Sequence, residues 1–153
     1  MYRKKRLKQI STEHIKRYVQ TIDKYKGEAI NDDNFVTGSL TILRRSLTDV
    51  LTHCGDDSKV LEWLKDFSRD SIKGWKYIGW LECQPYQPDH PKYDPKDPNK
   101  PKHPEAECFN YYMANIRGKN YYVSVKMHKM LGAEVLYVIT ENMEYEVHKG
   151  VRA

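Results

Sequence analysis

The chain has no long apolar run. No segment approaches the about 20 consecutive apolar residues that a membrane-spanning helix needs. The first residues are basic and lack the apolar core of a secretory signal peptide. These absences predict a soluble protein of the cytoplasm that has no membrane partner.

Cysteine is scarce. The three cysteines, Cys54, Cys83 and Cys108, are too few and too irregularly spaced for a disulfide framework or a CxxC metal site. Reduced thiols are expected, although Cys83 and Cys108 flank one long loop and would come close if the strands on either side pair. Together with His90 and His103 they could gather around that loop, but this wide spacing does not favour zinc. No metal or other cofactor is predicted.

Several catalytic motifs are also missing. The sequence contains no GxxxxGK[ST] phosphate loop, no GxGxxG, no HExxH and no GxSxG. Nucleotide hydrolysis, Rossmann-type cofactor binding, zinc proteolysis and esterase chemistry are therefore without support in the sequence.

Positive charge exceeds negative charge. Lysine and arginine number 26 against 21 aspartates and glutamates, which gives a formal net charge of +5 and a pI near 9.0. This balance favours a polyanionic partner such as RNA or another nucleic acid. Residues 1–10 are predicted to form a flexible basic arm that contacts phosphates or improves solubility. The length of 153 residues fits a single domain over residues 1–153.

Helical and extended patterns divide the chain into two halves. Apolar residues at helical spacing predict three N-terminal helices, from Ser11 or Thr12 to Tyr25, from about Leu40 to His53, and from about Asp56 to Ser68. Aromatic and β-branched runs predict strands at 75–83, 109–116, 121–129 and 135–140, with a further strand at 144–148 left open. Compact turns at 117–120 and 131–133 join the last three main strands. The predicted class is α+β, with about three helices packed on a four- or five-stranded antiparallel meander sheet.

Proline is confined to one segment. All seven prolines lie between Pro85 and Pro104. Because proline cannot donate to a β-ladder, residues 84–106 are predicted to be an extended surface loop inserted between the first strand and the meander. The composition fits a partner-binding arm and also a solvated insertion.

The segment Ser46-Leu47-Thr48-Asp49-Val50-Leu51-Thr52-His53 is the strongest candidate site. On a helix, Ser46, Asp49 and His53 follow one another beside an apolar stripe, at the border of the core. The same pattern also fits an ordinary amphipathic helix whose histidine finishes the last turn beside the C-terminal dipole.

The strand at 121–128 supplies a second polar face. Alternation places Tyr122, Ser124, Lys126 and His128 on one side of the sheet, which borders either a groove or bulk solvent. Metal-free RNA cleavage needs a base, a cation and an acid, and His53 and His128 are the two well-placed imidazoles. The other four histidines are predicted to lie on the surface: His14, His90, His103 and His148.

The order of these elements resembles that of a superfamily of small nucleases. The patterns that carry the resemblance are the helical segment 46–53, Phe109-Asn110-Tyr111-Tyr112, the run Ile116-Arg117-Gly118-Lys119-Asn120-Tyr121-Tyr122-Val123-Ser124-Val125-Lys126, and Leu136-Tyr137-Val138-Ile139. They are similar to the barnase, EndoU, colicin E5/D and RelE-like (BECR) nuclease domains of phage polyproteins, mobile elements and polymorphic toxins. The resemblance covers about residues 37–141. The chain departs from the family pattern at two places. Thr140 stands in the last strand in place of a second histidine, and the proline-rich segment is an insertion.

The resemblance implies a small metal-independent endoribonuclease, toxin-like or encoded by a mobile element, that cleaves RNA through its 2′-hydroxyl. It carries over His53, Lys126 and Thr140 as catalytic residues. The predicted substrate-binding residues are Arg44, Arg45, Ser46, Tyr122, Ser124 and His128. An immunity protein or a host protein is a further partner consistent with this function. The alternative is a non-enzymatic interaction protein of a phage or mobile element that binds nucleic acid, or a host nucleic-acid machine, through its basic surface.

Overall fold

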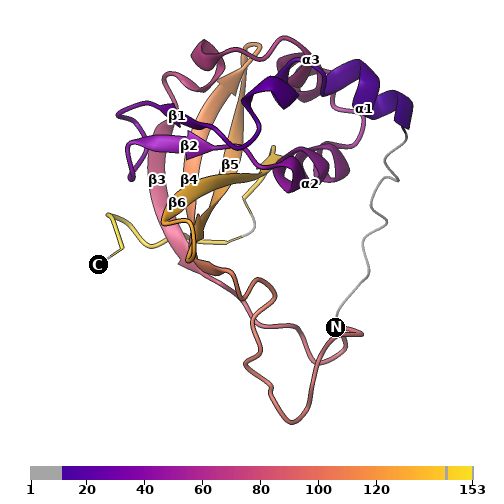
Figure 1. The fold of residues 1–153 in the computed structure, drawn as a ribbon. Helices are drawn as coiled ribbons and strands as arrows, with labels where there is room; N and C mark the ends of the chain where they lie inside the picture. Colours follow the sequence, from indigo (N-terminus) through magenta and orange to yellow (C-terminus); the bar gives the residue numbers. More distant parts are fainter. Residues whose placement is uncertain (1–11, 144, 153) are drawn as a thin grey trace.

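The computed structural model describes residues 12–143 and 145–152, which form three α-helices, two short 3-10 helices and one six-stranded sheet (Figure 1). The α+β class is the one that the sequence predicts. The basic arm predicted for residues 1–10 lies outside the described residues. Within the described ranges, no helix is long and apolar enough to cross a membrane.

The sheet is mixed, with the strand order β1-β2-β6-β5-β4-β3. The strands are β1 (Ala29–Asn31), β2 (Ser39–Thr41), β3 (Lys76–Glu82), β4 (Ala106–Ile116), β5 (Lys119–His128) and β6 (Ala133–Thr140). Strands β3 to β6 form the predicted antiparallel meander, but β2 pairs parallel with β6 and carries β1 at the edge. The prediction of a four- or five-stranded sheet, antiparallel throughout, was therefore wrong. Three-residue strands are too short to show an alternating pattern.

The β4–β5 hairpin closes more tightly than the predicted turn at 117–120. Arg117 and Gly118 both have positive φ, 50° and 84°, which is the conformation of a two-residue type I′ turn. Lys119 and Asn120 already pair with β4. At 144–148, Glu144 is not described, and the adjoining residues contribute one isolated bridge between His148 and Trp80.

The helices begin or end at different residues from those predicted. The first predicted helix is divided into α1 (Thr12–Tyr18) and the 3-10 helix η1 (Ile22–Tyr25). Helix α2 (Arg44–Cys54) begins four residues late because Leu40 and Thr41 extend beside β6. Helix α3 (Ser58–Lys65) is capped by the Asp57 side chain, which accepts from the amides of Lys59 and Val60, and η2 (Arg69–Ile72) follows it.

The helices cover one face of the sheet, and α2 lies beside β6 where β2 ends (Figure 1). The core between them contains Leu47, Val50 and Leu51 of α2, Val60, Leu61 and Leu64 of α3, and Tyr112, Tyr121, Val123, Val125, Leu136 and Ile139 of the sheet. Burial of each such side chain contributes about 1.5–3 kcal/mol. The alternation predicted for β5 is confirmed, because Tyr121, Val123 and Val125 all join this core.

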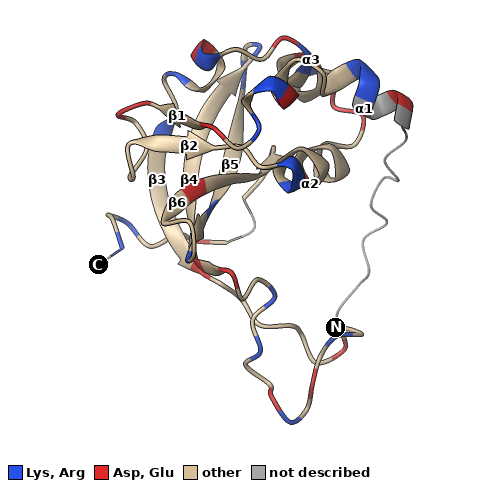
Figure 2. Ribbon diagram, in the orientation of Figure 1, with Lys and Arg blue, Asp and Glu red and all other residues tan. Residues whose placement is uncertain are grey.

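The proline-rich segment leaves the sheet between β3 and β4 and extends away from the body of the molecule (Figure 1). Positively and negatively charged residues are interspersed along it (Figure 2). Its two ends are tied together, since Lys102 N donates to Gln84 O over 3.0 Å and Tyr86 N donates to Lys100 O over 3.3 Å. The residues that follow this tie, 103–105, turn back onto the sheet.

Gly79 allows the C-terminal segment to lie against β3. Its φ is +148°, and a Cβ at this position would lie 2.4 Å from the His148 carbonyl oxygen and 2.6 Å from Val147 Cγ2. The backbones of Trp80 and His148 exchange two hydrogen bonds, of 3.0 and 2.9 Å, directly beside it. The backbone at His148 cannot move aside as the end of a flexible side chain can. An added methyl group at residue 79 therefore displaces the C-terminal segment around Val147 and His148.

The Gly79→Ala variant is therefore expected to lower the free energy of unfolding by about 1–3 kcal/mol through overpacking. Amide hydrogen exchange should locate the effect at Trp80 and His148, which lose protection. Gly132→Ala is the control, because Gly132 also has a positive φ, of +59°, but no atom lies within 4 Å of its added Cβ. Equal protection of the two amides in both variants would contradict the close-contact explanation.

Candidate functional site

On the face of the sheet opposite the main core, charged and aromatic side chains gather around Tyr137. The register of β5 against β6 shifts between Ser124 and Val125, which leaves Tyr137 as an extra residue in β6. The Tyr137 ring lies 5.2 Å from the His103 ring and 6.1 Å from the His53 ring, measured between centroids. Lys126 Nζ lies 5.2 Å from the same centroid. We call these side chains, with Glu105, the Tyr137 cluster.

Lys126 and Glu105 form a partly buried ion pair in this cluster. Lys126 is only 6% exposed, and its Nζ lies 2.5 Å from Glu105 Oε1. Partial burial by itself raises the pKa of Glu105. The hydrogen bond from Lys126, a backbone hydrogen bond, and the charges of Lys126 and His103 outweigh that effect and lower the pKa to about 2. Glu105 is therefore ionised at neutral pH and fixes the ammonium group in place.

His103 is placed as a neutral base. Burial lowers its pKa below 6.5, and the charge of Lys126 lowers it further, against the opposing charge of Glu105. Its Nδ1 lies 3.5 Å from Glu105 Oε1, and its Nε2 lies 3.2 Å from the Tyr137 hydroxyl. Burial raises the pKa of Tyr137 to about 12, so the phenol keeps its proton at neutral pH. Its hydroxyl can therefore donate a hydrogen bond to His103. The contacts assign the imidazole proton to Nδ1 and the lone pair to Nε2.

Helix α2 contributes a row of three polar side chains, Arg45, Asp49 and His53, at successive four-residue steps. Burial raises the pKa of Asp49, although Arg45, Lys126 and His53 oppose this effect. His53 Nδ1 lies 2.8 Å from the Asp49 backbone carbonyl oxygen, so Nε2 is the nitrogen directed outward. Asp49 and Glu105 thus have pKa values shifted in opposite directions, an arrangement typical of acid–base sites.

A cleft of about 210 Å³ lies between α2 and these sheet residues, and six polar side chains line it: Arg45, Ser46, Asp49, Glu105, Lys126 and His128. Four of the residues predicted from the sequence therefore meet at one cleft. His53 reaches the same cluster from the next turn of α2, through its contact with Tyr137.

Two of the predicted α2 residues differ from the rest: Ser46 lines this cleft with a hydroxyl that is already bonded, and Arg44 lies outside it. The Ser46 side chain is buried, and its Oγ accepts from the Leu43 amide over 3.1 Å, which fixes the first turn of the helix. Arg44 lines a separate groove against α1, with Lys16 and Asp23. The structure does not bring Arg44 into the Tyr137 cluster.

The predicted sheet residues also divide. His128 accepts from the Leu131 amide over 3.2 Å, at the rim of the cleft. Thr140 lies outside this cleft, at the end of β6, where its hydroxyl donates to the Asn142 carbonyl oxygen over 3.1 Å. It lines two other clefts, one with His53 and one with Ser124 and Tyr137. Tyr122 pairs with Thr140 across the strands, at the same end of β6. Lys126 is therefore the one predicted catalytic residue of the sheet that lies in the cluster.

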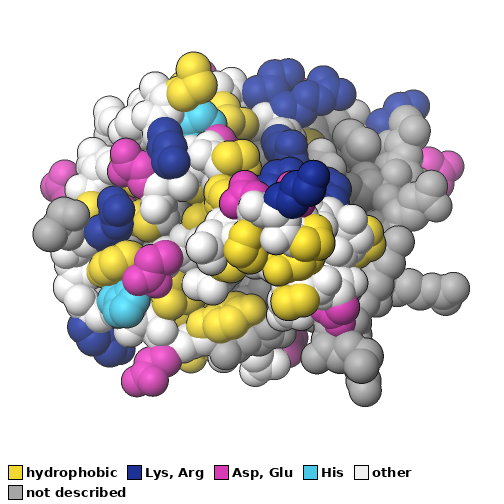
Figure 3. Space-filling model, turned by 90° about the horizontal axis from the view of Figure 1, so that it is seen from below, with side chains coloured by type: hydrophobic (Ala, Val, Ile, Leu, Met, Phe, Trp, Pro, Cys, Tyr) yellow, Lys and Arg dark blue, Asp and Glu magenta, His cyan; other side chains and the backbone are white. Residues whose placement is uncertain are grey.

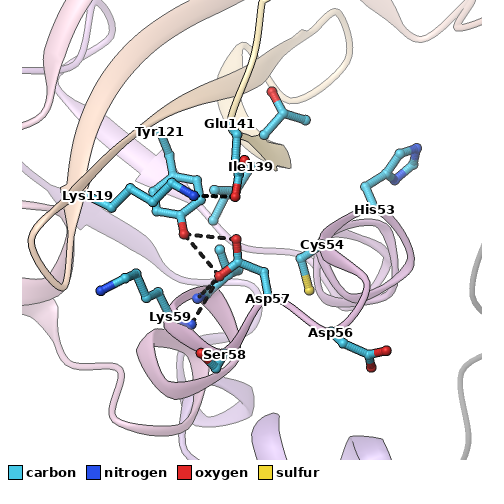
Figure 4. Close-up of a pocket in the computed structure, with 12 residues that line it drawn as sticks. His53, Cys54, Asp56, Asp57, Ser58, Lys59, Lys119, Tyr121, Ile139 and Glu141 are labelled. Carbon is cyan, nitrogen blue, oxygen red and sulfur yellow. Dashed lines mark hydrogen bonds and ion pairs between the residues drawn. The ribbon is translucent and has the colours of Figure 1, made fainter.

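A larger cleft, of about 620 Å³, lies on the other side of His53 (Figure 4). The Tyr121 hydroxyl donates to Asp57, Lys119 pairs with Glu141, and Lys59 Nζ donates to the Arg117 carbonyl oxygen. Figure 4 shows the His53 ring directed away from Asp57 and Tyr121. The named contacts hold α3 to the β4–β5 hairpin, and the hairpin to Glu141 after β6. His53 lines this cleft and also contacts the Tyr137 cluster.

Sequence reasoning missed His103, Glu105 and Tyr137. The prediction that His103 is a surface residue was wrong, because its side chain is 22% exposed and packs against Tyr137 and Phe109. The available signal was proximity in the chain, since residues 103–105 directly precede the strand that pairs with β5. All three cysteines are free thiols, so Cys83 and Cys108 form no bond.

Within residues 12–143 and 145–152, no group of three or more His, Cys, Asp and Glu side chains could hold a metal ion. No protein-family model, curated protein or solved structure matches this chain. The chemistry of the Tyr137 cluster is therefore the feature of this chain that points to a function.

Proposed function

We propose that the protein is a small metal-independent endoribonuclease, of the toxin-like or mobile-element kind that a resemblance to the BECR nucleases implies. One observation carries the proposal, the placement of two imidazoles and a buried ammonium around the Tyr137 ring. Cleavage of RNA through its own 2′-hydroxyl needs a base, an acid and a cation at the phosphate. His103, His53 and Lys126 supply these three groups.

The proposed reaction begins at His103. Its Nε2 takes the proton of the 2′-hydroxyl, which replaces the Tyr137 hydroxyl as the hydrogen-bond donor. The 2′-oxygen attacks phosphorus and the bond from phosphorus to the 5′-oxygen breaks. His53, as the imidazolium, gives its proton to that leaving oxygen. The products are a 2′,3′-cyclic phosphate end and a 5′-hydroxyl end.

Lys126 and Arg45 stabilise the phosphate as it gains negative charge. Glu105 acts as a positioning residue, because it fixes both Lys126 and His103. Asp49, between Arg45 and His53 on α2, aligns these two side chains.

The surroundings of the cluster fit a phosphate chain. A neighbouring cleft of about 390 Å³ adds Lys92 and Lys102 to Arg45 and His103. These two lysines come from the proline-rich segment, which therefore contributes to the proposed substrate-binding surface. On the face drawn in Figure 3, several of the described positive side chains gather in the upper middle, and the others lie singly among acidic and apolar ones. Binding is proposed to depend on the cations at the site, Arg45, Lys92, Lys102 and Lys126.

The test is cleavage of total RNA by the wild-type protein and by His53→Ala, each with and without EDTA. Wild type is expected to cleave in EDTA and to leave 2′,3′-cyclic phosphate ends. The His53→Ala variant is expected to lose about 10²–10⁴-fold in rate, the usual contribution of general acid catalysis. His148→Ala is the matched control, since His148 lies against Trp80, outside the cluster.

Equal rates for wild type and His53→Ala would contradict the role of His53. An absence of cleavage by either protein would contradict the nuclease itself. That result would favour the non-enzymatic alternative, in which the same basic groups bind nucleic acid or a host nucleic-acid machine without turnover.

A further inference from the structure

A second cleft adjoins the Tyr137 cluster on the same face of the sheet. It has a volume of about 350 Å³, and its lining includes Tyr111 of β4, Ser124 of β5, Tyr137 of β6 and Tyr145 of the following segment. Tyr137 is shared with the cluster, so the two spaces are neighbours. We call this space the tyrosine cleft.

Ser124 is an unexplained polar group in the lining of this cleft. The residue is 4% exposed. Among buried side-chain nitrogen and oxygen atoms of the described residues, its Oγ alone has no hydrogen-bond partner. A buried hydroxyl without a partner destabilises a fold, and such groups are rare and often functional. Because Ser124 lines the cleft, a ligand bound there can supply the missing hydrogen-bond partner.

Two tyrosines line the cleft without an aromatic or cationic partner, and of the two Tyr145 is the exposed one. In the part of the chain that the structure describes, neither Tyr111 nor Tyr145 forms a ring pair or a cation–π contact with another side chain. Tyr145 is 53% exposed. Burial raises the pKa of Tyr111 to about 12, so the phenol stays neutral. Neutral aromatic rings of this kind are the surfaces on which nucleic-acid bases stack.

We propose that the tyrosine cleft binds one unpaired nucleobase of the RNA, next to the phosphate held at the Tyr137 cluster. The volume lies at the small end of the range for small-molecule sites, which suits a single base. The base stacks on Tyr111 and Tyr145, and its edge exchanges a hydrogen bond with Ser124. A base can enter only when it is unpaired and unstacked, so the substrate class is single-stranded RNA. The location beside the scissile phosphate depends on the proposed ribonuclease function.

The experiment is an NMR titration of the 153-residue chain with adenosine, guanosine, cytidine and uridine, with ribose 5-phosphate as the probe that lacks a base. Saturable binding of at least one nucleoside is expected, with shifts at the tyrosine cleft. Tyr145→Ala should weaken that binding about tenfold, as expected for loss of one stacking contact. The control is Tyr93→Ala, because Tyr93 lies in the proline-rich segment, outside the cleft.

The Ser124→Ala variant gives a second test, in which stability and nucleoside binding should change in different directions. Removing an unpartnered hydroxyl should leave Tm unchanged or raise it, while nucleoside binding weakens several-fold. A serine with a purely structural role would not weaken binding. The proposal is overturned if no nucleoside saturates, or if Tyr145→Ala and Ser124→Ala bind as the wild type does.

The two proposals fail separately. Nucleoside binding at the cleft in a protein that cleaves no RNA would remove the ribonuclease and keep the base site. Cleavage without nucleoside binding would do the reverse. If both are present, single-stranded substrates should be cut faster than the same sequence in a duplex, and the preferred base should match the nucleoside that binds best.

Discussion

The His103→Ala variant is expected to lose RNA cleavage by about 10²–10⁴-fold while it keeps the wild-type fold. The His103 ring is the proposed base. Its Nε2 contacts the Tyr137 hydroxyl, and in the proposed reaction the 2′-hydroxyl of the RNA takes the place of that hydroxyl. Initial rates on a single-stranded oligoribonucleotide measure the loss, and circular dichroism checks the fold. Added imidazole should restore part of the rate, which it would not do for a residue that only packs. A variant with more than half of the wild-type rate would contradict the assignment.

The same base predicts the acidic limb of the pH profile. Burial and the charge of Lys126 lower the pKa of His103 below 6.5, so the neutral imidazole persists below that pH. The limb of kcat/KM should therefore lie below pH 6.5. Glu105 raises the pKa of His103, so Glu105→Gln should move the limb to still lower pH while kcat falls. A limb above pH 6.5, or one that Glu105→Gln leaves in place, would contradict the contact between these residues.

Much of the fold follows from sequence patterns that repeat over several turns or alternations. Val60, Leu61 and Leu64 have helical spacing, and the helix that they predict is confirmed, with Asp57 as its capping residue. Leu40 also continues the apolar stripe of α2, yet it lies in a strand. The hydrogen bonds of β2 with β6 come from residues more than 90 positions away, and no local pattern contains them.

The candidate site was half predictable for the same reason. Helical spacing places Asp49 and His53 at the border of the core, and alternation places Lys126 on the open face of β5; both placements are confirmed. Tyr137 could not be placed in this way. Leu136 and Ile139 both face the core although they are three residues apart, which strict alternation forbids. The extra residue in β6 changes the phase, and it directs Tyr137 to the face where His103 and Lys126 lie.

Glu134 is the residue whose loss should destabilise the protein most. It is fully buried in β6, and its carboxylate accepts four hydrogen bonds. Oε1 accepts from Asn110 Nδ2 over 2.7 Å and from the Tyr112 hydroxyl over 2.5 Å. Oε2 accepts from the amide and the hydroxyl of Thr37, over 3.0 and 2.9 Å. The carboxylate thus joins β4 to the loop between β1 and β2.

The Glu134→Ala variant is expected to lower the free energy of unfolding by about 3–5 kcal/mol, because it leaves two buried donors, Asn110 Nδ2 and the Tyr112 hydroxyl, without an acceptor and releases the exposed Thr37. For a chain of this size, Tm should fall by roughly 10 °C or more. Glu134→Gln keeps the shape but turns an NH₂ group toward one pair of donors, so its cost should lie between those of Glu134→Ala and the control. That control is Glu107→Ala, whose exposed carboxylate lies 3.8 Å from Arg152 and should contribute less than about 1 kcal/mol.

The loss of the Glu134 side chain should affect nucleoside binding only indirectly. Glu134 lies on β6, the strand that carries Tyr137, and it accepts a hydrogen bond from the β1–β2 loop. Strand β2, which follows that loop, pairs with β6. Below its midpoint of unfolding, Glu134→Ala should therefore bind nucleosides as the wild type does. A variant that unfolds early but binds normally would separate the stabilising role of this buried carboxylate from the chemistry of the opposite face. Loss of binding in the folded variant would show instead that the β1–β2 pair sets the geometry of β6 at Tyr137.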